Sequence, residues 1–141
     1  MNLQLSDDQK LLQDSFERFF AAESSIARVR AAEPLGFDRE LWNGIAQMGA
    51  LTIRVKGGAG AADSSILDAA ILMELAGKYL ASAPVAEAIT VARLLSSIDS
   101  DSASRWLDWL GEGRKIVTIA PYRDDILAML MRAQANGRFD E

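Results

Sequence analysis

A glycine-rich segment, Gly57-Gly58-Ala59-Gly60, has the composition of loops that hold phosphate at the start of a helix. It follows an apolar, strand-like run over residues 51–55 and precedes a long apolar stretch. The segment lacks the third glycine of a dinucleotide-binding fingerprint, because Asp63 stands there, and it lacks the Lys-Ser/Thr pair of a P-loop. We therefore interpret Gly57, Gly58 and Gly60 as a tight turn, in which glycine adopts positive φ without strain.

The carboxylates offer no clear pair for acid–base catalysis. Asp7, Asp8 and Glu112 fall at expected helix ends, where a negative charge complements the helix dipole or is solvated. Glu74 differs, because it lies inside the most apolar stretch and could be a buried acid with a raised pKa. We expect instead that it faces a solvated strip or pairs with Lys78 four residues on. No catalytic residue is assigned.

The aromatic residues and the absent residue types narrow the chemistry further. Trp42, Trp106 and Trp109 can stack on a ring cofactor, but their helical spacing with Leu and Ile favours core packing. The chain has no cysteine and no histidine, which excludes thiolate nucleophiles, imidazole bases, disulfides and Cys/His zinc sites. No metal site is expected.

The overall composition is typical of one soluble globular domain. The 141 residues are 50% hydrophobic and 25% charged, which suffices for a real core. A net charge of −5 with scattered Lys and Arg argues against nucleic acid or an anionic membrane as partner. The polar N-terminus does not resemble a signal peptide, and no apolar run approaches the ~18 residues of a membrane helix. We expect a cytoplasmic protein.

The apolar spacing predicts an all-α fold, a bundle of five or six helices. The expected helices span roughly residues 6–22, 25–32, 38–48, 66–80, 84–95 and 106–110. The helix over 66–80 is apolar on most of its circumference and should be the central, most buried one, with Ile71, Leu72 and Leu75 in the core. Cap signals stand at Ser6 with Gln9, Asp38, Gly49 and Ser65 with Asp68, and Pro84 suits a first helical turn.

The pattern changes after Gly113. Residues 115–120 are a continuous β-branched run, which predicts a strand. Residues 124–131 fit either one last helix or further strand material, and periodicity does not separate the two. We therefore expect a helical domain over 1–113, with 114–141 as the start of a truncated β-domain or a C-terminal tail.

Several short motifs, taken together, resemble one known family. Residues 5–12 are similar to the pattern L-(S/T)-x-(E/D)-Q-x-x-L, and residues 41–51 to L-W-x-x-(L/I)-A-x-x-G-(L/A)-L. The glycine segment and the run Glu74-Leu75-Ala76 follow in the same order, as G-G-x-G and E-L-(A/G). Their order and spacing resemble the N-terminal helical domain of acyl-CoA dehydrogenases. One departure is Arg54-Val55-Lys56, where that family usually has Pro-Glu-x-Tyr.

The resemblance implies FAD-dependent oxidation of an acyl-CoA thioester to the 2,3-enoyl-CoA, as in fatty acid β-oxidation. In that family the N-terminal helices wall the acyl pocket, the β-domain holds the flavin and the C-terminal helices supply a glutamate base. This chain has neither of the last two parts. The resemblance therefore implies a domain that is not catalytic and binds no FAD alone, although the complete enzyme holds FAD.

By position in the family, the segment after the central helix lines the acyl channel. The resemblance therefore places Pro84, Val85 and Ala88 at the substrate pocket, although alanines also suit close helix packing. The chain would be a fragment, or a subunit that completes its site in a homo- or hetero-oligomer with acyl-CoA dehydrogenase-like chains. The alternative is a non-catalytic helical module whose apolar helices bind a protein partner.

Overall fold

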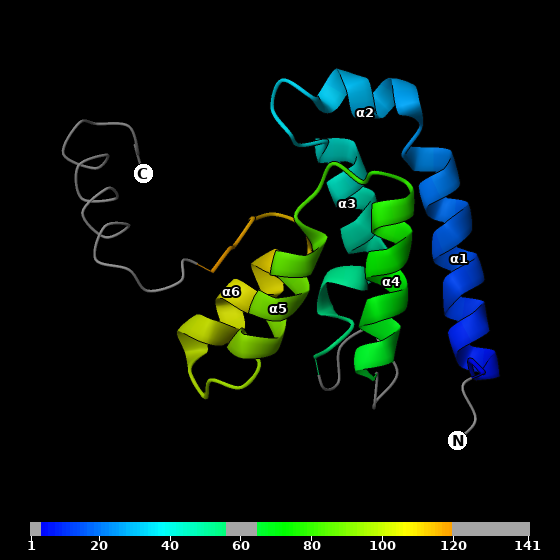
Figure 1. The fold of residues 1–141 in the computed structure, drawn as a ribbon. Helices are drawn as coiled ribbons and strands as arrows, with labels where there is room; N and C mark the ends of the chain where they lie inside the picture. The colour runs from blue at the N-terminus through cyan, green and yellow to red at the C-terminus, as the bar shows by residue number, and fades with distance from the viewer. Residues whose placement is uncertain (1–3, 56–64, 120–141) are drawn as a thin grey trace.

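The computed structural model describes residues 4–55 and 65–119, and within these ranges the fold is all-α, as predicted (Figure 1). No strand occurs in the described ranges. The glycine segment Gly57–Gly60 and residues 124–131 lie outside them. The helices are α1 (Asp7–Glu23), α2 (Ile26–Ala32), α3 (Arg39–Gln47), the 3-10 helix η1 (Ala50–Thr52), α4 (Ile66–Lys78), α5 (Val85–Leu95) and α6 (Asp101–Gly111).

The helices pack around α4 and α5. α1 lies along α4, and α4 packs against α5, which runs in the opposite direction (Figure 1). α5 also packs on η1 and α6, while α2 crosses the end of the bundle next to the start of α3. As a result, α5 has neighbours on several sides.

Polar side chains begin three of the helices as the sequence predicted. The Ser6 hydroxyl accepts from the Gln9 N–H at 3.2 Å, and the Gln9 side chain accepts from the Ser6 N–H at 3.0 Å, which is a capping box. Ser65 and Asp68 form the same arrangement at α4. Asp38 accepts the first free N–H groups of α3.

The strand-like interpretation of residues 51–55 is wrong. Gly49 adopts the left-handed conformation predicted for it, with φ of 72°, and the chain turns at once into η1. Local backbone hydrogen bonds, from the Thr52 N–H to the Gly49 carbonyl and from Ile53 to Ala50, hold this turn. The run is apolar because Leu51 and Ile53 are buried in the core.

Three other local predictions need correction. Pro84 is the N-cap of α5, one position before the first turn. α6 begins at Asp101, several residues before the expected start near 106. Residues 115–119 form neither helix nor strand, because no neighbouring strand in the described ranges pairs with them.

The core lies where α1, α3, α4 and α5 meet. Ile71, Leu72 and Leu75 are buried there, as predicted. α4 is not the most buried helix, however, because it leaves Ile66 77% and Leu67 45% exposed, and the shorter α5 buries more residues. The largest fully buried side chains are Trp42, Phe20, Leu41, Ile45, Leu51, Leu72 and Leu110.

Candidate functional site

An apolar groove runs between α4 and α5 and reaches Arg54, which follows η1. Its volume is about 530 Å³, within the range of small-molecule sites. α4 contributes small or flexible side chains, and α5 contributes the opposite wall. The lining residues are Arg54, Ile66, Ala69, Ala70, Met73, Ala86, Ile89, Thr90, Arg93 and Leu94.

Side-chain sizes explain why the two helices leave this space. Ala69 and Ala70 on α4 and Ala86 on α5 present only methyl groups where larger side chains would meet. Ile66 and Leu94, which are 77% and 50% exposed, stand at the rim. Exposed large apolar side chains beside a hollow are typical of a surface that a ligand or another segment covers.

The pocket residues expected from the sequence are not among the described residues that line this groove. Val85 is 2% exposed and Ala88 1% exposed, both within the hydrophobic core. Pro84 caps the helix and does not line the groove. The groove is instead lined by the neighbouring face of α5, which begins with the exposed Ala86.

The sequence analysis did not select Ala70, Met73 or Arg93. The sequence does contain one indication of the side of α4 that lines the groove. α4 is apolar on more of its circumference than one buried face requires. The sequence alone predicts that this extra apolar surface is buried on several sides. The structure shows that part of it borders the groove.

Glu74 is exposed on α4, in agreement with the solvated position expected for it. Lys78 does not pair with Glu74 but forms an ion pair with Glu17 of α1. Each partner stabilises the charge of the other, so this contact lowers the pKa of Glu17 and raises the pKa of Lys78. Glu74 therefore has no geometry that supports catalysis.

The tryptophans divide into one core residue and one surface pair. Trp42 is fully buried, as predicted. Trp106 is 42% exposed and meets the half-buried Trp109 edge to face, with ring centroids 5.1 Å apart. Core packing is therefore the wrong interpretation for Trp106, because much of its side chain is exposed.

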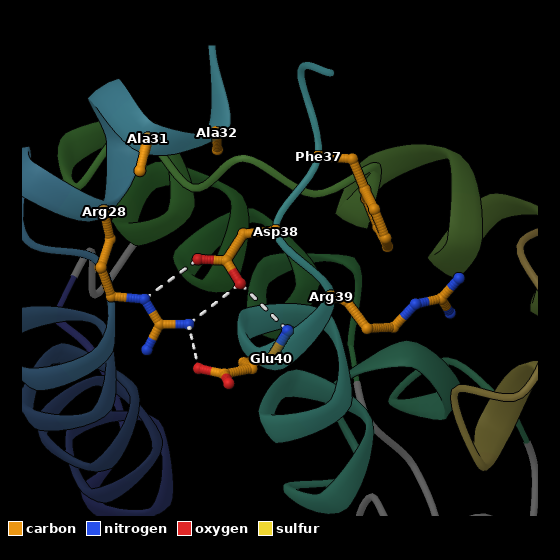
Figure 2. A pocket seen from close by; sticks show the side chains of 7 residues that line it. All are labelled: Arg28, Ala31, Ala32, Phe37, Asp38, Arg39 and Glu40. Carbon is orange, nitrogen blue, oxygen red and sulfur yellow. Dashed lines mark hydrogen bonds and ion pairs between the residues drawn. The ribbon is translucent and has the colours of Figure 1, made fainter. Parts of the chain in front are cut away.

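A second, smaller hollow of about 260 Å³ lies between α2 and the start of α3 (Figure 2). Arg28 of α2 points across it and donates to both carboxylate oxygens of Asp38, at 3.0 and 2.9 Å. The same guanidinium also pairs with Glu23 at 2.9 Å and with Glu40 at 3.3 Å. The lining residues are Arg28, Ala31, Ala32, Phe37, Asp38, Arg39 and Glu40.

The main charged side chains of this second hollow pair with one another and so stabilise the fold. The Arg28 guanidinium holds the pKa of Asp38 below its usual value, and the N–H groups of Leu41 and Glu40 add to this effect. Asp38 in turn raises the pKa of Arg28. We therefore interpret this cluster as the bridge that fixes the corner between α2 and α3, and the groove as the better candidate site.

Two other kinds of feature are absent from the described residues. No group of three or more acidic residues is placed to hold a metal ion in the described ranges. None of the helices described there is long and apolar enough to cross a membrane. The site is thus an open apolar groove on a helical domain, suited to a largely hydrophobic ligand.

Comparison with known proteins assigns this helical domain to a family. The chain matches the family described as acyl-CoA dehydrogenase, N-terminal domain, over residues 6–112. It is similar to acyl-CoA dehydrogenase IpdE2 of Mycolicibacterium smegmatis, with 30% identity over 118 residues. That alignment covers 82% of this chain and 37% of the relative, so the chain spans well under half of the relative's length. No solved structure matches the chain significantly.

The chain belongs to the acyl-CoA dehydrogenase family and carries its N-terminal domain. This confirms the resemblance inferred from the helix order and the short motifs. The matched range ends one residue after α6, so it contains both helices of the groove.

Proposed function

We propose that this chain forms the N-terminal helical wall of the acyl pocket in an FAD-dependent acyl-CoA dehydrogenase. The observation that carries the proposal is the groove, which is apolar, open on one side and lined by small residues of α4 and α5. Family membership supports a thioester as the ligand. The reaction would be α,β-dehydrogenation of an acyl-CoA, a step in lipid breakdown.

The chain's own contribution would be to bind and orient the acyl group. The methyl groups of Ala69, Ala70 and Ala86 leave room for it, and Met73 and Ile89 supply apolar contact. Removing water from this surface would stabilise the bound chain in proportion to the apolar area covered. No residue in the described ranges is assigned as the base.

The described residues do not fit a flavin site. The N-terminal N–H groups of α1, α3 and α4, which suit phosphate binding, are already capped by Ser6, Asp38 and Ser65. FAD would supply the hydride acceptor in the complete enzyme, held by other parts of it. We propose a division near residue 113, with 114–141 belonging to the next domain or a tail, which is supported by the end of α6 at Gly111.

The test is binding of octanoyl-CoA to the isotope-labelled chain, followed by amide NMR shifts, with CoA alone as the ligand control. We expect shifts in α4 and α5 with octanoyl-CoA. Ala70→Phe, which fills the groove, should weaken binding at least fivefold, whereas Ala22→Phe on an exposed part of α1 should not. Shifts confined to other helices, or equal affinity in Ala70→Phe, would contradict the proposal.

A second candidate, a helical module that binds a protein chain, is favoured by exposed apolar residues around α6. Ile98, Trp106 and Ile116 are 54%, 42% and 43% exposed. They would be covered in a homo- or hetero-oligomer with acyl-CoA dehydrogenase-like chains. Sedimentation across a concentration series tests self-association, which Trp106→Ser should weaken if this face is the contact.

A further inference from the structure

A side-chain hydrogen bond joins the two capping boxes at the starts of α1 and α4. The amide Nε2 of Gln9 donates to Oδ1 of Asp68 at 2.9 Å. Oε1 of Gln9 accepts from the Ser6 N–H at 3.0 Å, so the amide nitrogen must be the end that faces Asp68. The second carboxylate oxygen of Asp68 accepts from the Ser65 N–H at 2.6 Å. The bond therefore links the first turns of both helices in one defined orientation.

α1 and α4 run in the same direction, so their first turns lie at the same end of the bundle (Figure 1). A second polar contact between them, the ion pair of Glu17 with Lys78, involves the last residue of α4. Lys78 does not line the groove. The Gln9–Asp68 bond, in contrast, lies at the end of α4 that does. The groove-lining residues of α4 are Ile66, Ala69, Ala70 and Met73.

The first turn of α4 has few contacts with the core. The buried residues of α4 begin at Ile71. Within the described part of the chain, none of residues 66–70 is buried, and Ile66 and Leu67 are 77% and 45% exposed. Helix ends with few buried apolar contacts open locally at a lower free energy than the core. The position of this turn therefore depends on its polar contacts more than the rest of α4 does.

We infer that Gln9 is a positioning residue for the groove, because through Asp68 it holds the turn of α4 that carries Ala69 and Ala70. This inference rests on the proposed function and adds to it a residue that does not itself line the groove. Without the bond, the wall would be in place in only a fraction of the molecules, and the apparent affinity for the acyl group falls by that fraction. We expect a loss of roughly three- to tenfold, the usual size for one hydrogen bond.

Reversing the direction of the bond tests this role. Gln9→Glu keeps an oxygen that accepts from the Ser6 N–H, but it replaces the donor that faces Asp68 by a second carboxylate. Adding Asp68→Asn supplies a donor from the other side, while its amide oxygen still accepts from the Ser65 N–H. The double variant Gln9→Glu/Asp68→Asn should therefore re-form the bond. Glu17→Gln is the matched control, because it removes the contact between the same two helices away from the groove.

Octanoyl-CoA is titrated into each labelled chain at a temperature where circular dichroism shows that all variants are folded. A residue that only stabilised the fold would not change the affinity of molecules that are all folded. Gln9→Glu and Asp68→Asn should each weaken binding by roughly three- to tenfold, and the double variant should return to within about twofold of wild type. Amide hydrogen exchange without ligand should be faster in the first turn of α4 in both single variants. Glu17→Gln should keep the wild-type affinity.

Three outcomes overturn the inference and leave the proposed function standing, provided that octanoyl-CoA shifts α4 and α5 of the wild type. They are wild-type affinity in Gln9→Glu and Asp68→Asn, a loss that the double variant does not recover, and an equal loss in Glu17→Gln. Either single variant suffices for the first outcome if the other does not fold. Failure of octanoyl-CoA to shift α4 or α5 of the wild type overturns both the inference and the proposed function.

Discussion

The indole N–H of Trp42 donates a hydrogen bond of 2.8 Å to the backbone carbonyl of Gly113, and both groups are buried. This contact joins the middle of α3 to Gly113, the second residue after the end of α6. Gly113 adopts a φ of 71°, and a Cβ there would lie 2.9 Å from the Cβ of Ala46. Trp42 therefore holds the segment after α6 against α3 at a position where glycine is required by conformation and by space.

Trp42→Phe should destabilise the domain by roughly 2–4 kcal/mol. The substitution removes volume from the core and leaves the Gly113 carbonyl buried without its donor. Urea unfolding followed by circular dichroism measures the change. Trp106→Phe, on the exposed face of α6, should change stability by less than about 0.5 kcal/mol, and equal effects of the two variants would contradict this account.

Leu75→Ala should cost roughly 2–5 kcal/mol, as is usual when a large core side chain is truncated. Leu75 is 3% exposed and lies in the hydrophobic core. Leu67→Ala makes the same chemical change on the same helix, but Leu67 is 45% exposed and should cost far less. Thermal melts compare the pair. A shift under about 2 °C for Leu75→Ala would show that this face of α4 does not support the core.

Asp38→Asn should reduce stability by roughly 1–2 kcal/mol at pH 7. The amide keeps an oxygen to cap α3 but loses the charge that faces Arg28. Because Arg28 lowers the pKa of Asp38 in the folded state, the stabilisation is present above the unfolded pKa of about 4 and is lost as the pH falls through the folded pKa.

The difference between wild type and Asp38→Asn should therefore shrink below about pH 4. Chemical unfolding at a series of pH values from neutral to acidic measures it. Glu40→Gln is the control, because Glu40 contacts the same guanidinium but its side chain is 86% exposed. A difference that stays constant down to the lowest pH would show that the charge of Asp38 does not contribute.

Local chemistry explains which parts of the fold could be predicted from sequence. Ser6, Asp38 and Ser65 cap helices by contacts within three residues of the chain. All residues of each cap are therefore neighbours in the sequence, and the cap can be predicted from it. The family resemblance likewise rested on the order of local motifs. The strand-like interpretation of residues 51–55 failed because β-branched and apolar residues occur both in strands and in buried turns.

Tertiary packing explains what could not be predicted. Ala86 and Ala88 are both small residues in the first turn of α5, and only the positions of η1 and α6 decide that Ala88 faces inward. Similarly, the exposure of Trp106 depends on what packs on α6, which helical periodicity does not specify. The groove likewise depends on residues such as Arg54 and Arg93, which lie far apart in the sequence and line the same hollow only in the folded chain.

The chain alone should not bind FAD in stoichiometric amount. The helix N-termini of α1, α3 and α4 carry their own caps, and the family's flavin-binding strands are not among the described residues. The visible absorbance of the purified chain, before and after dialysis against FAD, measures this. A flavin spectrum near one equivalent, retained through gel filtration, would contradict the prediction.

Ala86→Phe and Ala88→Phe should act in different ways although they make the same change on one helix turn. Ala88 is 1% exposed, so a phenyl ring there must displace core side chains, and we expect a loss of about 1–3 kcal/mol in unfolding free energy. Ala86 is exposed at the groove, where a ring has space on the solvent side, so stability should change by less than about 0.5 kcal/mol.

The two variants should also differ in their preference for acyl chain length, and here Ala86→Phe should have the larger effect. Ala86→Phe narrows the apolar end of the groove next to Met73, so acyl-CoA thioesters of eight or more carbons should lose affinity relative to butanoyl-CoA. Ala88→Phe, once its stability is restored by lower temperature, should keep the wild-type order of chain lengths. Titrations of the acyl-CoA series with both variants measure this order. An altered order in Ala88→Phe with an unchanged one in Ala86→Phe would place the acyl chain behind α5, at Pro84, Val85 and Ala88, and not in the groove.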